Sequence, residues 1–197
     1  MMSGARSSAR VERVTAGLVL HELRTHNFGV LSTVDEHGRP RSAGVNYGVS
    51  APGNGLAIYV MTRRHLQKAR NIARNPNVAL VVPLRRRLLW FLPPPTIQLS
   101  GRAEIFEPND LAGVEAFRVF WMGRRILKAY AKSARRGEMR ICFLKITLDP
   151  LIRTYMVGYG IWELRSRMES GAAKVGISPP SIGAHFEAES VALRSRP

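Results

Sequence analysis

The chain has only one cysteine, Cys142, among its 197 residues. One thiol cannot form a disulfide within the chain, and it excludes a cysteine-rich metal site. Cys142 lies in the apolar run ICFLKI, so we expect a buried structural thiol and not a nucleophile. The 5 histidines are scattered without the spacing of metal ligands, and no metal site is predicted.

Long hydrophobic runs are also missing. No stretch of about 18 apolar residues suggests a membrane span, and the polar, basic start MMSGARSSARVERVTAG has no signal-peptide core. We therefore expect a cytoplasmic protein. A Ser/His/Asp grouping, an HExxH motif, a phosphate-binding P-loop and a paired-carboxylate motif are absent as well. The catalytic residues therefore stay unassigned.

Acidic residues are few: 14 Asp and Glu stand against 30 Lys and Arg, a formal net charge of +16. Such a charge favours anionic partners, among them an acidic small ligand, an anionic membrane surface or nucleic acid. Adaptation to an arginine-rich proteome explains the charge equally well. No nucleic-acid readout motif is evident, so nucleic acid is the least favoured partner.

Segments rich in branched and aromatic residues alternate with turn residues and predict a mainly β protein with flanking helices, an α+β fold. Residues 1–10 are expected to be disordered, 11–170 to form one domain, and 171–197 to be a disordered tail. Helices are predicted over 11–26, 64–74 and about 109–134, the last with a break near Gly123 and a cap at Asn109 or Asp110. Strands are predicted over 29–33, 42–49, 56–62, 78–82, 96–106, 140–148 and 154–162.

Three segments carry a family resemblance: FGVLSTVDEHGRPRSAGV from Phe28, YVMTRRHLQKARNIARNPNVAL from Tyr59, and TIQLSGRAEIF from Thr96. Their order and spacing resemble the flavin-binding split-barrel superfamily typified by pyridoxamine 5'-phosphate oxidase. The resemblance implies a six-stranded split β-barrel that forms a homodimer, with two cofactor sites at the subunit interface.

The same resemblance implies a phosphate seat where the third strand enters a helix. Thr62 and Lys68 match the family's phosphate contacts, and Gln67 stands where the oxidase has an arginine. Unpaired amides at a helix start favour a phosphate as well. Arg63, with Arg64 and Arg70, is expected to compensate for the missing arginine, and Asn71 completes the cluster.

The second strand departs from the oxidase pattern. Ala43 and Gly48 take the places of an arginine and a lysine that grip the phosphate, and Arg41 is the expected substitute for them. Asn46 and Thr96 are expected to border the cofactor ring, Thr96 standing where the family has a glutamine. Tyr47 is interpreted as core packing. The loss of the two cations makes authentic pyridoxamine 5'-phosphate oxidase activity unexpected.

These observations predict an oxidoreductase that uses FMN or the deazaflavin coenzyme F-420. It would transfer a hydride to or from a small organic substrate, with the cofactor supplying the chemistry. The alternative is a non-catalytic split-barrel protein that binds flavin or haem, or that attaches peripherally to a membrane. Two segments with interleaved cations and aromatic residues, 84–95 and 117–136, support membrane attachment, although a core-packed helix with a solvated basic face also explains the second.

Overall fold

The computed structural model describes residues 14–51, 55–84, 94–137, 140–158 and 171–177. Within these residues the helices are α1 (Ala16–Thr25), α2 (Gln67–Arg74), α3 (Leu111–Arg118) and α4 (Trp121–Arg135). The strands are β1 (Phe28–Val34), β2 (Pro40–Val49), β3 (Ala57–Arg63), β4 (Asn77–Pro83), β5 (Thr96–Phe106), β6 (Ile141–Leu148), β7 (Leu151–Tyr155) and β8 (Ala172–Gly176).

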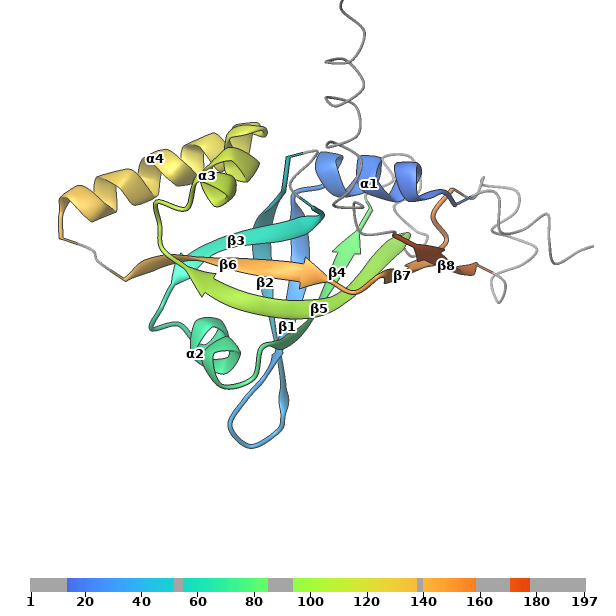
Figure 1. Ribbon diagram of the computed structural model, residues 1–197, viewed down its shortest axis with the longest axis horizontal. Helices are drawn as coiled ribbons and strands as arrows, with labels where there is room; N and C mark the ends of the chain where they lie inside the picture. Colours follow the sequence, from blue (N-terminus) through green and yellow to red (C-terminus); the bar gives the residue numbers. More distant parts are fainter. Residues whose placement is uncertain (1–13, 52–54, 85–93, 138–139, 159–170, 178–197) are drawn as a thin grey trace, which may run out of the picture.

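Six of these strands form a closed antiparallel barrel (Figure 1). Their order is β4-β1-β2-β3-β6-β5, and the pairing of β4 with β5 closes the ring. The strand β5 is 11 residues long. It pairs with β6 over Gly101–Phe106 and with β7 over Thr96–Gln98, so the β7–β8 hairpin extends the sheet beyond the barrel. The predicted six-stranded barrel with flanking helices is confirmed.

Alternating side chains fill the barrel, because successive residues of a strand point to opposite faces. In β5, Ile97 and Leu99 are buried inside while Gln98 and Ser100 are exposed outside. Two helices close the ends of the barrel (Figure 1). Val19 and Leu23 of α1, and Ala69 and Ile72 of α2, belong to the same buried cluster as the barrel interior.

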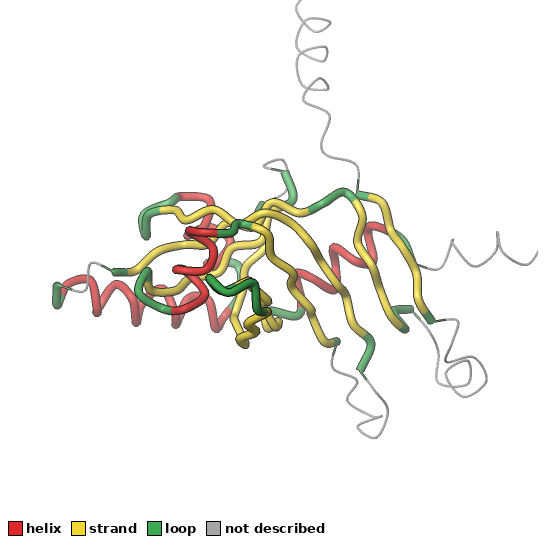
Figure 2. The backbone as a smooth tube through the Cα atoms, turned by 90° about the horizontal axis from the view of Figure 1, so that it is seen from below, coloured by secondary structure: helices red, strands yellow, loops and turns green. Residues whose placement is uncertain are grey.

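The helices α3 and α4 lie against one side of the barrel (Figure 2), where they share a buried hydrophobic cluster with residues of β3 and β6. Phe117 is fully buried there, and its ring centroid lies 5.6 Å from that of Phe143 on β6. The helices approach each other closely: a Cβ on Gly123 would lie 2.1 Å from the carbonyl oxygen of Phe117. This second cluster is separate from the barrel core.

Two expectations about single residues are confirmed. Tyr47 is fully buried, and its hydroxyl donates a hydrogen bond to the Leu23 carbonyl at 3.0 Å, which joins β2 to α1. Cys142 is buried in β6, and burial raises the pKa of its thiol. The protonated form is therefore favoured, as a structural thiol requires.

Three expectations about the elements need correction. The tail predicted from residue 171 was wrong for Ala172–Gly176, which form β8 and pair with β7; this strand is only five residues long and has weak β propensity. The long helix divides at Val119–Phe120, before Gly123, because Phe120 has extended backbone and begins α4 as its N-cap. The seventh strand is Leu151–Tyr155, earlier than predicted.

Other expectations fall outside the described residues. These are the disordered residues 1–10, the tail beyond 177, and positions 85–93 of the basic aromatic segment 84–95. Among the described helices, none combines the length and the apolar character that crossing a membrane requires.

Candidate functional site: the α2 end of the barrel

The β1–β2 hairpin is organised around the carboxylate of Asp35. Its Oδ1 accepts hydrogen bonds from the amides of His37 and Arg39, each at 2.9 Å. Its Oδ2 accepts from the Nε atoms of Arg39 at 3.2 Å and Arg41 at 2.9 Å. A turn aspartate that binds the amides following it is a common hairpin device. Here it also fixes the direction of two arginines.

Asp35 stays ionised because of these donors. Burial by itself raises the pKa of its carboxyl, but the Arg39 amide, the Arg41 guanidinium and the His37 amide outweigh burial and hold the pKa well below its usual range. The carboxylate side chain is only 4% exposed, whereas those of Arg39 and Arg41 are 60% and 52% exposed. The hairpin therefore presents its cations to solvent and keeps the anion underneath.

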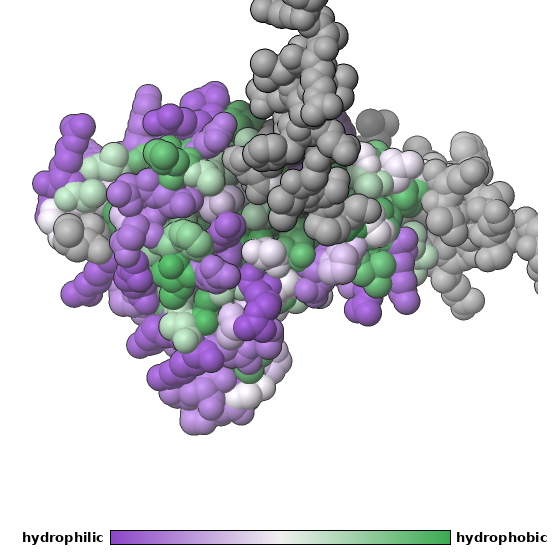
Figure 3. All heavy atoms as spheres, in the orientation of Figure 1, coloured by the Kyte–Doolittle hydropathy of each residue, from purple (hydrophilic) through white to green (hydrophobic). Residues whose placement is uncertain are grey.

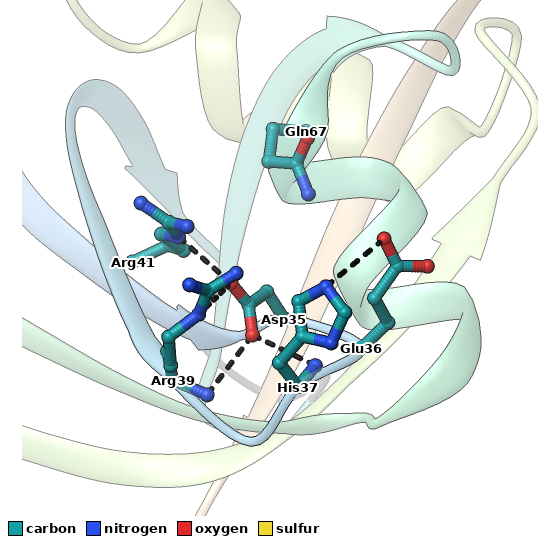
Figure 4. Close-up of a pocket in the computed structure, with 6 residues that line it drawn as sticks. All are labelled: Asp35, Glu36, His37, Arg39, Arg41 and Gln67. Atoms are coloured by element: carbon teal, nitrogen blue, oxygen red, sulfur yellow. Dashed lines mark hydrogen bonds and ion pairs between the residues drawn. The ribbon is translucent and has the colours of Figure 1, made fainter.

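A hollow of about 350 Å³ lies between this hairpin and α2 (Figure 4). Gln67 faces it from the first turn of α2, opposite Arg39 and Arg41 of the hairpin. The remaining lining residues are Asp35, Glu36 and His37. Two of the residues predicted to hold a cofactor, Arg41 and Gln67, are thus brought together.

The amino end of α2 has the properties of an anion seat. Its N-cap, Leu66, makes no side-chain capping hydrogen bond, and the first turn contains no acidic residue. The amides of Ala69 and Arg70 bond to the Leu66 carbonyl. Among the described residues, no acceptor is found for the amides of Gln67 and Lys68. Free amides, the positive end of the helix dipole and the half-buried Lys68 favour an anion at this position.

A chain of hydrogen bonds ties this helix end to the hairpin. Gln67 Nε2 donates to Asn71 Oδ1 at 2.9 Å, and Asn71 Nδ2 donates to Thr33 Oγ1 at 2.9 Å. The Thr33 hydroxyl in turn donates to the Arg41 carbonyl at 3.4 Å. Asn71 is fully buried and both ends of its amide are engaged. Its position gives it the role of holding Gln67 and Arg41 in register, so it has no surface for contact with a ligand.

The other predicted phosphate contacts lie at the junction of β3 and α2. Thr62 ends the inward-facing row of β3 and is 3% exposed, which leaves little of its hydroxyl accessible. Arg63 points the other way, toward α4, with its guanidinium carbon 5.4 Å from the centre of the Tyr130 ring. Arg64 forms an ion pair with Glu107 at 2.5 Å. Neither Arg63 nor Arg64 is among the described residues that line the hollow. Their compensation for the missing arginine stays a prediction.

Asn46 and Thr96 lie on the outer face of the barrel. Asn46 is exposed on β2 and Thr96 is half-buried on β5. Two strands, β4 and β1, separate β5 from β2, and neighbouring strands are about 4.8 Å apart. One barrel therefore does not bring these two side chains into contact with each other.

The structure explains the glycine that replaces a family lysine. A Cβ on Gly48 would lie 2.5 Å from the Ala116 carbonyl oxygen and 2.7 Å from its carbon. The α3 backbone therefore occupies the space that a side chain on Gly48 would need. No cation can stand at this position while α3 packs on β2.

A second hollow, of about 310 Å³, lies near the opposite end of the barrel, where α1 ends. Apolar side chains of α3 and the following turn line it, together with Arg24, Asn27, Ser50 and Glu115. None of the predicted cofactor-binding residues lines this hollow. The predicted residues that line a hollow, Arg41 and Gln67, therefore lie at the α2 end.

A closed six-stranded antiparallel barrel with flanking helices defines a split-barrel protein. The sequence pattern of the family described as pyridoxamine 5'-phosphate oxidase matches residues 18–148. The chain belongs to this family. Among curated proteins, a search with this chain found no match.

Solved structures share the fold at low sequence identity. The haem storage protein HutZ from Vibrio cholerae is 16% identical with a TM-score of 0.53, over 71% of this chain and 94% of its own. A conserved hypothetical protein from Mycobacterium tuberculosis is 17% identical with a TM-score of 0.53, over 72% and 84%. A haem-binding protein from Mycobacterium smegmatis is 17% identical with a TM-score of 0.52, over 89% of this chain and 59% of its own. At these identities the likeness concerns the fold alone.

Proposed function

We propose that this protein is a flavin- or deazaflavin-dependent oxidoreductase whose cofactor phosphate binds at the amino end of α2. The observation that carries the proposal is the uncapped, acid-free first turn of α2, with two amides that have no acceptor among the described residues. Gln67 of this turn lines a hollow together with Arg39 and Arg41 of the hairpin. Family membership supports the same assignment.

The residues present fit a phosphate monoester. The amides of Gln67 and Lys68, the Lys68 ammonium and the Gln67 amide group supply donors, and a charged donor roughly doubles the strength of such a bond. Arg41 reaches the hollow from β2 while its Nε stays on Asp35. The hydrogen-bonded chain through Asn71 and Thr33 orients this set before any ligand arrives. Of the predicted contacts, Arg41 and Gln67 line the hollow, whereas Thr62, Arg63 and Lys68 are not among its described lining residues.

The bound flavin or deazaflavin would supply hydride transfer, and the protein would supply binding, orientation and charge. The strongly basic chain suits a deazaflavin with an acidic tail, while the phosphate seat serves FMN equally well. Neither choice requires an acid–base pair on the protein.

We further propose that the functional unit is a homodimer formed through the outer face of β1, β2, β4 and β5. Small residues there are exposed or half-buried: Ser32, Ser42, Gly44, Asn46 and Ala79. A second copy on this face would bring the Thr96 of one protomer toward the Asn46 of the other. Both predicted ring contacts could then border the same cofactor, which they cannot do within one barrel. Sedimentation of the purified protein across a dilution series tests the dimer.

Fluorescence titration with FMN and with coenzyme F-420 tests the cofactor proposal. The Lys68→Ala variant removes one charge-assisted contact, about 1.5–3 kcal/mol, so Kd should rise about 10- to 150-fold. The matched control is Lys174→Ala, which removes an exposed lysine of β8 and should leave Kd unchanged. Gln67→Arg restores the arginine of the oxidase pattern and should tighten binding. Equal Kd values for the Lys68→Ala and Lys174→Ala proteins would overturn the phosphate seat.

A non-catalytic haem- or flavin-binding role is the second candidate. It is favoured by the fold likeness to a haem storage protein and a haem-binding protein. Titration with haem, followed by its absorbance, separates the two. Tight haem binding that Lys68→Ala leaves intact, with no flavin or deazaflavin bound, would replace the oxidoreductase proposal.

A further inference from the structure

The outer face of α4 carries a row of cations that the redox proposal does not use. Trp121, Arg124, Arg125, Lys128, Lys132 and Arg135 recur every three or four residues, which places them on one side of a helix. All six are exposed. We call this set the α4 basic stripe. The opposite side of α4 is apolar, and Ile126 and Leu127 there pack on the second cluster, which contains Phe117 and Phe143.

The stripe contains no acidic residue. The sequence from Ala116 to Gly137 has seven cations and no aspartate or glutamate. Among the described residues, the ion pairs involve none of the stripe cations. Arg124 donates a hydrogen bond to the Arg118 carbonyl, but none of these cations has a carboxylate partner among the described residues. Such a helix face favours an anionic surface outside the chain.

Apolar side chains lie exposed where the stripe begins. Val119 is 71% exposed, Trp121 58% and Met122 41%. The guanidinium carbon of Arg125 lies 5.2 Å from the centre of the Trp121 ring, so the aromatic residue and the cations form one continuous surface. Figure 3 shows hydrophilic side chains projecting from the α3–α4 region, with hydrophobic patches among them. Exposed tryptophan beside cations is typical of helices that lie in a membrane interface.

We propose that the α4 basic stripe, with Val119 and Met122, docks the protein peripherally on a bilayer of anionic phospholipid. Its cations would lie among the headgroups, and Trp121 would insert at the level where headgroups meet acyl chains. The helix axis would lie in the plane of the surface, because the opposite face of α4 remains packed on β3 and β6.

Two other occupants fit less well. A second copy of this chain also carries a net charge of +16, so two stripes would repel each other. A nucleic acid would account for the cations but not for Val119 and Met122 beside them, since phosphate contacts need charge alone. The lipid surface is the partner that uses both parts of the patch.

Co-sedimentation with vesicles tests the proposal. The full-length protein is incubated with vesicles of equimolar phosphatidylglycerol and phosphatidylcholine, or of phosphatidylcholine alone. We expect binding to the anionic vesicles only, and release when NaCl is raised from about 0.1 M to about 1 M, which shortens the screening length from about 10 to about 3 Å.

Charge variants assign the binding to the stripe. Each cation near an anionic surface contributes roughly a fivefold factor in partition, so Arg125→Gln/Lys128→Gln/Lys132→Gln should weaken binding about a hundredfold. The matched control, Arg102→Gln/Arg153→Gln/Lys174→Gln, removes three exposed cations of β5, β7 and β8 and changes the net charge equally. Equal loss in both triple variants would mean that only the net charge matters, and it would overturn the proposal.

A spectroscopic test asks whether Trp121 enters the interface. The chain has 3 tryptophans, and Trp90→Phe/Trp162→Phe leaves Trp121 alone. Its emission should shift to shorter wavelength with anionic vesicles and stay constant with phosphatidylcholine vesicles. Single-stranded RNA and duplex DNA are titrated in parallel. Nucleic acid binding that the stripe variant abolishes, with no vesicle binding and no emission shift, would overturn the lipid assignment.

Discussion

The two basic regions of this molecule, the α2 end of the barrel and the outer face of α4, differ in where their cations find partners. At the α2 end, Arg39 and Arg41 bind Asp35, and Arg74 binds Glu36 at 2.6 Å. On α4, no described carboxylate pairs with a stripe cation. Internal partners fix the geometry of a site for a small ligand. Cations without such partners form an adaptable surface that suits a large partner.

The regions also differ in their support. Behind the α2 end stands a polar chain, Gln67–Asn71–Thr33, that joins helix and hairpin. Behind α4 stands an aromatic cluster, in which Phe117 contacts Phe143 and Phe120 at 5.6 and 5.5 Å between ring centroids. Hydrogen bonds fix the direction of the side chains that they join. Aromatic packing stabilises the position of a helix without fixing the side chains on its exposed face. Substitutions in each region, compared by their effect on stability, distinguish these two kinds of support.

The largest effect is expected from Phe117→Ala. This fully buried ring is the centre of the cluster that holds α3 and α4 on the barrel. Truncation of such a residue costs about 3–5 kcal/mol in the free energy of unfolding, measured by urea denaturation. The control is Phe28→Ala, at a ring that is 47% exposed. Equal losses in the two variants would show that α3 does not pack on the barrel as described.

The Gly48→Ala variant probes the contact between β2 and α3. The added methyl would meet the Ala116 backbone, so we expect a loss of about 1–3 kcal/mol from overpacking. On the same strand, Gly44→Ala meets only the Phe28 ring, at 3.1 Å, and that half-exposed ring can move aside. Thermal unfolding of the pair should therefore rank Gly48→Ala well below Gly44→Ala. The reverse order would contradict the close approach of α3.

The Asn71→Leu variant probes the polar support at the α2 end. It leaves the buried Thr33 hydroxyl without its donor, at a cost of about 1–3 kcal/mol. Adding Thr33→Val removes the remaining polar partner, so the double variant should recover part of the loss. Unfolding measurements on the four proteins of this cycle give the coupling. Simple additivity would mean that the two side chains do not interact.

The strands of the barrel were predictable because their signals are local. Alternating apolar residues and the turns DEHGRP and NPN define β1 to β4 to within two residues at each end. The division between α3 and α4 was expected four residues too late, since Gly123 is a helix-weakening residue in sequence but a close-packing residue in the fold. β8 carries little signal of its own and forms because β7 offers it an edge.

The candidate site was predictable only in part. The resemblance pointed to Arg41 and Gln67, which the fold does bring to one hollow. Asp35 was not among the predicted site residues, although an aspartate two and four residues before backbone amides is a signal for the contacts it makes. The burial of Asn71 and the turn of Arg63 toward Tyr130 depend on tertiary contacts that no local pattern encodes.

The smallest effect is expected from Asp35→Asn, and it should depend on pH. The folded pKa of Asp35 lies below its unfolded value of about 3.9, so the ionised carboxylate stabilises the fold above that pH. This contribution is lost as the pH falls from the unfolded pKa toward the lower folded pKa. The stability difference between wild type and Asp35→Asn should therefore be constant near neutral pH and shrink below about pH 4. The control, Glu36→Gln, removes an exposed carboxylate from the same hairpin. If the stability advantage of wild type over Asp35→Asn persisted unchanged in acid, the arginines would be oriented on the hairpin without the charge of Asp35. The contrast with the α4 cations, which have no carboxylate partner among the described residues, would then lose its basis.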